Sequence, residues 1–168
     1  RLANENTWEA TTGYNKLNHT LNVTQAAAAT LTAAATTDVN VSGITVIDGN
    51  ISVKGGNDVV VTDSKAGAAI TVSNGAGTTG HATGTITVTD TDNSAANAIT
   101  VNGGTDVTVT ATATASTTGA IAIGGAKAAT GDVKVTQNLN SANDAADITA
   151  AAINVTGGKT VTVDVNST

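Results

Sequence analysis

Residues 51–61 read Ile-Ser-Val-Lys-Gly-Gly-Asn-Asp-Val-Val-Val, and nearly the same wording returns at residues 99–109 and 153–163. The later copies read ITVNGGTDVTV and INVTGGKTVTV. The apolar positions and the Gly-Gly pair are kept, whereas the polar letters vary. A fixed apolar skeleton with freely varied polar positions is how repetitive β-structure is encoded. The repeat therefore predicts a structural surface protein rather than an enzyme with one site.

The repeating unit is longer than this wording. A second matching half, Gly-x-x-x-Val-Thr followed by Asn-Ser-Ala, begins at Gly84 and again at Gly131. The first halves begin at residues 51, 99 and 153, so the unit is about fifty residues with four strands. We expect repeat units at residues 51–98 and 99–152 and a truncated unit at 153–168, with the length differences in Gly/Asn/Ala-rich loops.

The β-repeat domain is expected over residues 39–168. Its short runs alternate apolar and polar residues, which is the period of a half-buried strand. The outward positions are Thr71, Thr87, Thr100, Thr108 and Lys134, among others. The predicted strands cover residues 39–41, 44–47, 51–53, 59–61, 70–72, 86–88, 99–101, 107–109, 121–123, 133–135, 153–155 and 161–163.

Residues 1–38 differ from the rest and are predicted to form an N-terminal arm or cap. The only aromatic residues, Trp8 and Tyr14, lie there. In the Ala/Thr run at 25–37 the alanines favour helix and the threonines favour strand, so both remain open. Because the chain starts at Arg1 and stops in mid-pattern, we expect a mature fragment or a piece of a longer repeat protein.

The composition bounds the fold to an all-β class built from small residues. The chain has 168 residues without Phe, Met, Pro or Cys, so its core must consist of Val, Ile and Ala. Burying one Val or Ile side chain contributes roughly 1.5–3 kcal/mol, so many small layers must be stacked. A parallel β-helix-like solenoid needs no aromatic core pieces and is favoured. The alternative is a β-sandwich or hairpin array, in which each Gly-Gly segment closes a short hairpin.

The charge pattern limits the partners. The net charge is −6 and only 12% of residues are charged. Nucleic-acid backbones and anionic membranes need clustered Lys or Arg, so neither is expected as a partner. No run approaches the roughly 18 apolar residues of a membrane helix, so no membrane insertion is expected. The absence of Cys makes the protein independent of redox state and favours an extracellular location.

These repeated sequence patterns resemble the β-strand-repeat regions of large bacterial surface proteins, including adhesins, filamentous-haemagglutinin-like proteins and surface-layer proteins. The residues that match are Gly49-Asn-Ile-x-Val-x-Gly-Gly-x-Asp-Val59 and Val133-Lys-Val-Thr-Gln137. The resemblance covers residues 39–165. It implies an exported, repetitive role that is structural or adhesive.

A catalytic constellation is not expected. Of the two histidines, His19 and His81, the second lies in a Gly/Thr loop and is predicted to be a solvated loop residue. Glu occurs only outside the repeat, and Asp58 and Asp106 recur at equivalent positions, as turn-forming residues do. We predict no enzymatic activity and no catalytic residue.

Calcium is the one ligand that the sequence suggests. Asp90, Asp92 and Asn93 offer oxygen atoms at closely spaced positions, which hard cations prefer. Asx turns at strand ends explain the same letters, so calcium is a weak hypothesis and no other cofactor is expected.

Threonine strings at residues 85–91 and 108–114 place Thr at alternate positions. Ranked threonines on a flat sheet can order water and bind ice. The threonines are not confined to one recurring strand, as an ice-binding face would demand.

The sequence therefore predicts a structural or adhesive module of an extracellular bacterial assembly, such as a surface layer, filament or adhesin stalk. Its expected partner is itself, through β-structure, with surface glycans as a further partner. A bacteriophage fibre or decoration protein is the alternative. A carbohydrate- or ice-binding β-solenoid is the second alternative.

Overall fold

The computed structural model describes residues 7–9, 19–24, 28–42, 49–65, 67–73, 80–113, 115–140 and 147–167, and these contain strands and turns but no helix. Within these described residues, fourteen strands form two sheets. They are β1 (Thr7–Glu9), β2 (His19–Thr24), β3 (Ala29–Ala33), β4 (Thr37–Ser42), β5 (Ile51–Gly55), β6 (Val59–Asp63), β7 (Ile70–Val72), β8 (Ile86–Asn93), β9 (Ile99–Val101), β10 (Val107–Ala113), β11 (Ile121–Ile123), β12 (Val133–Leu139), β13 (Ile153–Val155) and β14 (Val161–Ser167).

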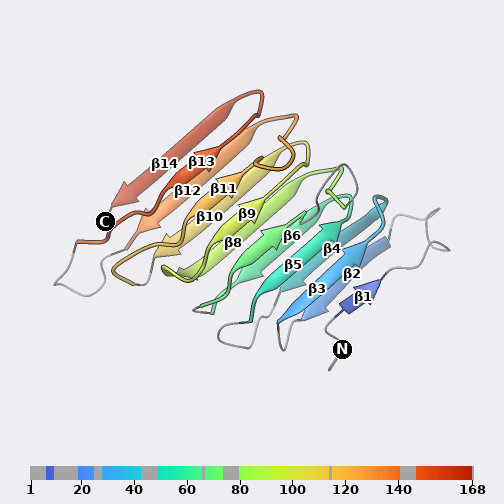
Figure 1. Cartoon of the computed structure of the whole chain (residues 1–168), viewed down its shortest axis with the longest axis horizontal. Coiled ribbons are helices and arrows are strands. Elements are labelled where there is room, and N and C mark those ends of the chain that lie inside the picture. Colours follow the sequence, from blue (N-terminus) through green and yellow to red (C-terminus); the bar gives the residue numbers. More distant parts are fainter. Residues whose placement is uncertain are drawn as a thin grey trace.

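The chain alternates between the two sheets. Strands with odd numbers form one seven-stranded sheet in sequence order, and strands with even numbers form the other. We call these the odd-strand sheet and the even-strand sheet, and each consecutive odd–even pair a coil. Figure 1 shows the coils added one after another, with the sequence colours running in order along the stack. The topology is consistent with a parallel β-helix-like fold.

All pairings between the named strands are parallel. Two strands joined by a Gly-Gly segment, such as β5 and β6, therefore lie in different sheets instead of pairing as a hairpin. The hairpin-array alternative is wrong for the described strands. By its sequence alone, the segment around Gly55 and Gly56 could equally well form a hairpin loop. Only the pairing partners of β5 and β6 distinguish a hairpin array from a parallel β-helix-like fold.

The predicted strands are confirmed except at residues 44–47, which lie outside the described residues. Each of the other eleven runs falls inside a strand, and four match a strand end to end. Within the Ala/Thr run, the described part forms β3 and the start of β4, so helix is wrong there. Strands β1 to β3 continue the two sheets, and their role as a cap stays a prediction.

The core consists of Val and Ile columns that run along the stack. In the odd-strand sheet Ile51, Ile70, Ile99 and Ile121 are in register and at most 1% exposed. The even-strand sheet contributes two further inward columns, Val39-Val59-Ile86-Val107-Val133 and Val41-Val61-Val88-Val109-Val135. Each coil thus adds one small apolar layer, as the aromatic-poor composition requires.

The Gly-Gly pair forms the corner at which the chain crosses from an odd strand to the even strand of the same coil. Gly55 and Gly56 have φ of 70° and 93°, and the other two copies also have positive values. This left-handed region favours glycine because it has no Cβ. In the second copy a Cβ on Gly104 would lie 2.9 Å from Cδ1 of Ile86.

Candidate functional site

Two buried aspartates lie side by side where β6 and β8 end. Asp63 and Asp90 are register partners on the inward faces of these neighbouring strands. Both are 0% exposed. The Lys65 backbone N–H donates to Asp63 Oδ1 at 3.0 Å, whereas Asp63 Oδ2 is buried without a hydrogen-bond partner. Burial raises the pKa of Asp63, and the backbone N–H groups of Lys65 and Ser64 partly oppose this.

Asp90 belongs to the predicted calcium residues and is better hydrogen-bonded than Asp63. Its Oδ1 accepts the Asp92 backbone N–H at 3.0 Å, and its Oδ2 accepts the Asn93 side-chain amide at 2.7 Å. Burial raises the pKa of Asp90 to about 6, the bonds from Asn93 and Asp92 lower it, and the charges of Asp63 and Asp92 raise it. Asp90 therefore gains a proton more readily than an ordinary carboxyl group.

A β-bulge brings Asn93 to the same corner. The register between β8 and β10 passes from Asp90–Ala111 to Asn93–Ala113, so β8 holds one extra residue. This shift turns Asn93 inward, where it is fully buried. Its Oδ1 accepts the Gly119 backbone N–H at 2.8 Å. One of the predicted calcium ligands thus uses its oxygen to join the next coil, while Asp92 stays half-buried at the bulge.

Asn97 continues this corner toward the preceding coil. Its Oδ1 accepts the Gly67 backbone N–H at 2.8 Å, and its amide donates to the Lys65 carbonyl at 3.2 Å. Together, Asn93 and Asn97 connect three successive coils through side-chain amides. Their first role is structural, as expected for Asx residues at strand ends.

Gln137 occupies the same inward column as the aspartates, further along the stack. The column runs Asp63–Asp90–Ala111–Gln137 by register. Gln137 is 0% exposed, and neither its Oε1 nor its Nε2 has a hydrogen-bond partner. Buried polar atoms without partners are uncommon in proteins and indicate an unseen water, ion or strain. Its buried polar side chains therefore distinguish this column from the Val and Ile columns of the core.

Sequence reasoning missed Asp63 and Gln137. In β6 the apolar phase is Val59, Val61 and then Asp63, and in β12 it is Val133, Val135 and then Gln137. A polar residue in the inward phase of an alternating strand is the signal that would have found both.

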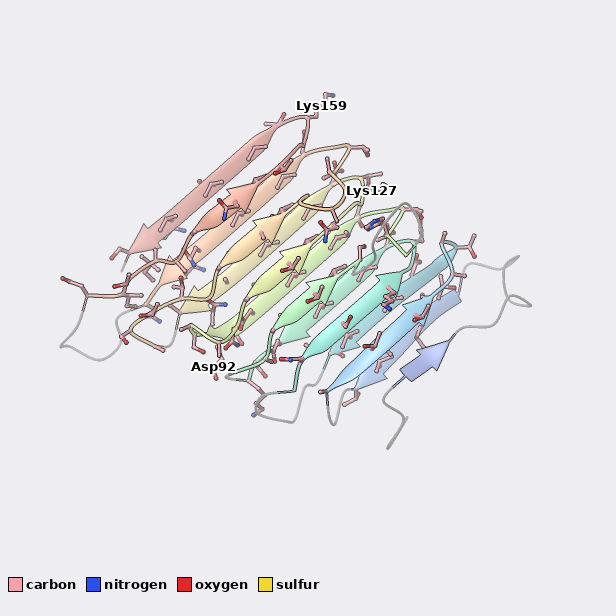
Figure 2. All side chains as sticks on the ribbon, in the orientation of Figure 1. Asp92, Lys127 and Lys159 are labelled. Carbon is pink, nitrogen blue, oxygen red and sulfur yellow. The ribbon has the colours of Figure 1, made fainter. Side chains whose placement is uncertain are left out.

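Asp58 and Asp106 are turn residues, as predicted. Asp58 Oδ1 accepts the Thr85 backbone N–H at 2.7 Å, and Asp106 Oδ1 accepts the Asp132 backbone N–H at 2.7 Å. Each carboxylate thus joins its coil to the next. Figure 2 shows Lys127 and Lys159 at one end of the strands and Asp92 at the opposite end.

The prediction of a solvated His81 is wrong, since this residue is 4% exposed. It packs beneath a Gly-Gly corner, where a Cβ on Gly103 would lie 3.0 Å from the His81 Cβ. The side chain of His19 lies outside the described residues. The prediction that the protein is not an enzyme stays a prediction.

The outer face of the even-strand sheet carries threonines in register. The threonines are not confined to one recurring strand, as expected, since Thr71 and Thr100 lie on odd strands. The two Thr-x-Thr strings nevertheless lie on the adjacent strands β8 and β10. They form one column of Thr62, Thr89, Thr110 and Thr136 and a second column containing Thr87 and Thr108.

The last coil exposes core positions at its edge. Val161 and Val163 are register partners of Val133 and Val135, and Val165 is the partner of Gln137. These three valines are 46%, 44% and 49% exposed, although their partners are at most 1% exposed. An edge strand with apolar side chains is a template for a further strand.

Comparisons with known proteins find no match among family models, curated proteins or solved structures. Within the part of the chain that the structure describes, no three His, Cys, Asp or Glu residues group at a spacing that holds a metal ion. Nor does this part contain a helix long and apolar enough to cross a membrane.

Proposed function

We propose that this chain is a β-solenoid structural module of an extracellular bacterial assembly of the surface-layer, filament or adhesin-stalk type. Copies would join through the edge of the last coil, β13–β14. The observation that carries the proposal is the continuous parallel stack, in which apolar columns run in register from β4 through β14. The resemblance to β-strand-repeat regions of bacterial surface proteins supports the extracellular role.

The sequence of coil β13–β14 indicates that a further parallel coil can pack against its edge. Coil β13–β14 repeats the wording of β5–β6 and β9–β10. Both of those coils are covered by a further parallel coil, and there Val59, Val61, Val107 and Val109 are fully buried. Covering a half-exposed valine stabilises by roughly 1 kcal/mol. The hydrogen bonds of a new strand ladder add to this and set its register.

At the opposite end of the stack, β2 continues the same columns, although its Val23 is only 9% exposed. Leu21 and Val23 on β2 are register partners of Val39 and Val41, so they occupy the same columns as Val161 and Val163. If β2 of a second copy pairs with β14 in parallel, the apolar columns continue from one copy to the next. Such a head-to-tail contact is heterologous and generates open filaments.

Electron microscopy of the purified 168-residue chain tests this function. Ordered filaments or sheets that lengthen with protein concentration are expected. A monodisperse monomer at all concentrations would contradict it.

A second candidate function is ice binding, which is favoured by the threonine columns. In-register strands lie about 4.8 Å apart, and alternate residues along a strand lie about 6.6 Å apart. Thr87, Thr89, Thr108 and Thr110 therefore mark a regular grid of hydroxyl and methyl groups on the even-strand sheet. β-Branched side chains have few rotamers, so the grid is held with little loss of entropy. A polysaccharide partner is less favoured, since no aromatic residue lies on the described strands of this face.

Thermal hysteresis of freezing tests this candidate. Replacing Thr89 and Thr110 with Lys should remove the activity. The control Thr71→Lys changes the outer face of the odd-strand sheet and should leave it. Absence of hysteresis in the unmodified chain would contradict ice binding.

A further inference from the structure

Two buried carboxylates meet inside the corner where β6 and β8 end. Asp63 and Asp90 are direct register partners and are 0% exposed. The charge of Asp92 acts on both of them. Burial raises the pKa of Asp63, and the charge of Lys65 acts to lower it. Two carboxylates side by side in a desolvated place are costly when both are ionised and no cation lies between them.

The hydrogen bonds at this corner leave several carboxylate lone pairs without a donor. Asp63 Oδ2 is buried and has no partner, whereas Asp63 Oδ1 accepts the Lys65 N–H. Each oxygen of Asp90 accepts one hydrogen bond, so each keeps a second lone pair. In the same column Gln137 contributes an Oε1 that is also without a partner. The small side chain of Ala111 separates Gln137 from Asp90. The buried Asp63 Oδ2, which has no hydrogen-bond partner, is the observation that points to a ligand at this corner.

We propose that Asp63 and Asp90 hold a calcium ion inside this corner. The donors are all oxygen, which a hard cation requires. Calcium accepts irregular coordination and loses its water readily, whereas magnesium keeps several waters, for which a fully buried pair leaves little room. Asp92 contributes charge from the bulge. Asn93, with its Oδ1 bonded to Gly119, orients Asp90 and is not a ligand.

This site goes beyond the proposed assembly and does not depend on it, since both aspartates lie far from the β14 edge in strand order. Two carboxylates give a weak site, and extracellular calcium sites bind at about 10⁻⁴–10⁻³ M. Calcium would bind the folded corner but not the unfolded chain, and it should therefore stabilise the folded state by mass action.

Thermal unfolding with and without calcium tests the proposal. At about 10 mM calcium, the Tm of the unmodified chain should rise by roughly 5 °C and then saturate, and magnesium should give a smaller rise. Asp63→Asn keeps the shape of the side chain and should lose this rise. The matched control Asp164→Asn removes the same charge from an exposed outward position on β14 and should keep it.

Equilibrium dialysis of the unmodified chain provides a second measurement that does not depend on a variant folding. About one calcium ion per chain is expected near neutral pH. No binding at 10 mM, or a Tm rise that Asp63→Asn retains, would overturn the proposal. It would also be overturned if acidification to pH 5 raises the Tm equally with and without calcium, because the pair would then hold a proton.

Discussion

Asp58 on one coil holds Thr85 on the next: its Oδ1 accepts the Thr85 backbone N–H at 2.7 Å and the Thr85 hydroxyl at 3.0 Å. Gly84 precedes Thr85, and a Cβ there would overlap the same carboxylate oxygen. Asp106 and Gly131 repeat this arrangement one repeat later. A repeated aspartate and a repeated glycine that lie apart in the sequence thus form one contact between coils.

Gly84→Ala should destabilise the fold by about 2 kcal/mol, because the new methyl group displaces Asp58 and its two hydrogen bonds to Thr85. Urea unfolding measures this. Gly125→Ala is the control, since a Cβ at Gly125 meets nothing within 4 Å. Because Asp58→Ala removes the same contact, the double variant should lose less than the sum of the single variants. The contact between Asp58 and Gly84 would be contradicted if Gly84→Ala lost no more stability than Gly125→Ala. It would also be contradicted if the losses of Gly84→Ala and Asp58→Ala simply added in the double variant.

Cysteine pairs should report the parallel register, and the absence of native Cys makes them easy to interpret. Thr110 and Thr136 are register partners on the outer face of β10 and β12. Neighbouring strands place such Cα atoms about 4.8 Å apart, within disulfide range. Oxidation should therefore link a Thr110→Cys/Thr136→Cys chain internally. The pair Thr100→Cys/Thr108→Cys lies on outer faces of different sheets and should not link. The opposite result would support a hairpin at Gly103.

Stability should fall as pH rises from 4 to 7 in calcium-free buffer. The pKa of Asp90 is about 6 in the folded chain, above its ordinary value of 3.8, so the folded state binds this proton more tightly. The stabilisation is complete below pH about 4 and is lost as pH passes through about 6, with a total of about 3 kcal/mol. Asp63, also with a raised pKa, contributes in the same direction, and Asp92 and Lys65 face the pair.

Urea unfolding of Asp90→Asn at the same pH values isolates this effect. The variant should show a flatter profile than the unmodified chain and a smaller deficit at pH 7. Added calcium should reduce the loss in the unmodified chain, because the ion competes with the proton. Parallel profiles for the two proteins would contradict a raised pKa at Asp90.

The strand positions could be predicted from the sequence, since alternation and β-branched residues specify a half-buried strand locally. The pairing partners could not. The segment around Gly55 and Gly56 suits a hairpin or a coil corner, and the difference appears only where β6 pairs with β4 and β8. In the same way, the threonines of β8 and β10 come together only because the coils are parallel and in register.

The pairing of Asp63 with Asp90 could not be predicted from the sequence for a related reason. Asp63 and Asp90 belong to strands whose coils differ in length, so sequence spacing does not reveal their register. Their column changes from Asp to Ala111 to Gln137 along the stack, and no repeated motif marks it. The sequence singles out Asp90 through its neighbours Asp92 and Asn93, whereas its register partner Asp63 lies on another strand.

The apolar edge of β14 is the central element of the proposed assembly, and one substitution pair tests it. Val163→Asp places a charge in an apolar column at the edge, where a second copy would cover it. Val60→Asp makes the same change on the outward face of β6, at a valine that is 39% exposed and away from the edge. Circular dichroism should show both variants folded, because each residue is already exposed.

Sedimentation velocity over a range of protein concentrations is the most direct measurement. The unmodified chain and Val60→Asp should form species that grow with concentration, whereas Val163→Asp should remain a monomer. Growth that persists in Val163→Asp, or its absence in the unmodified chain, would contradict assembly through the β14 edge.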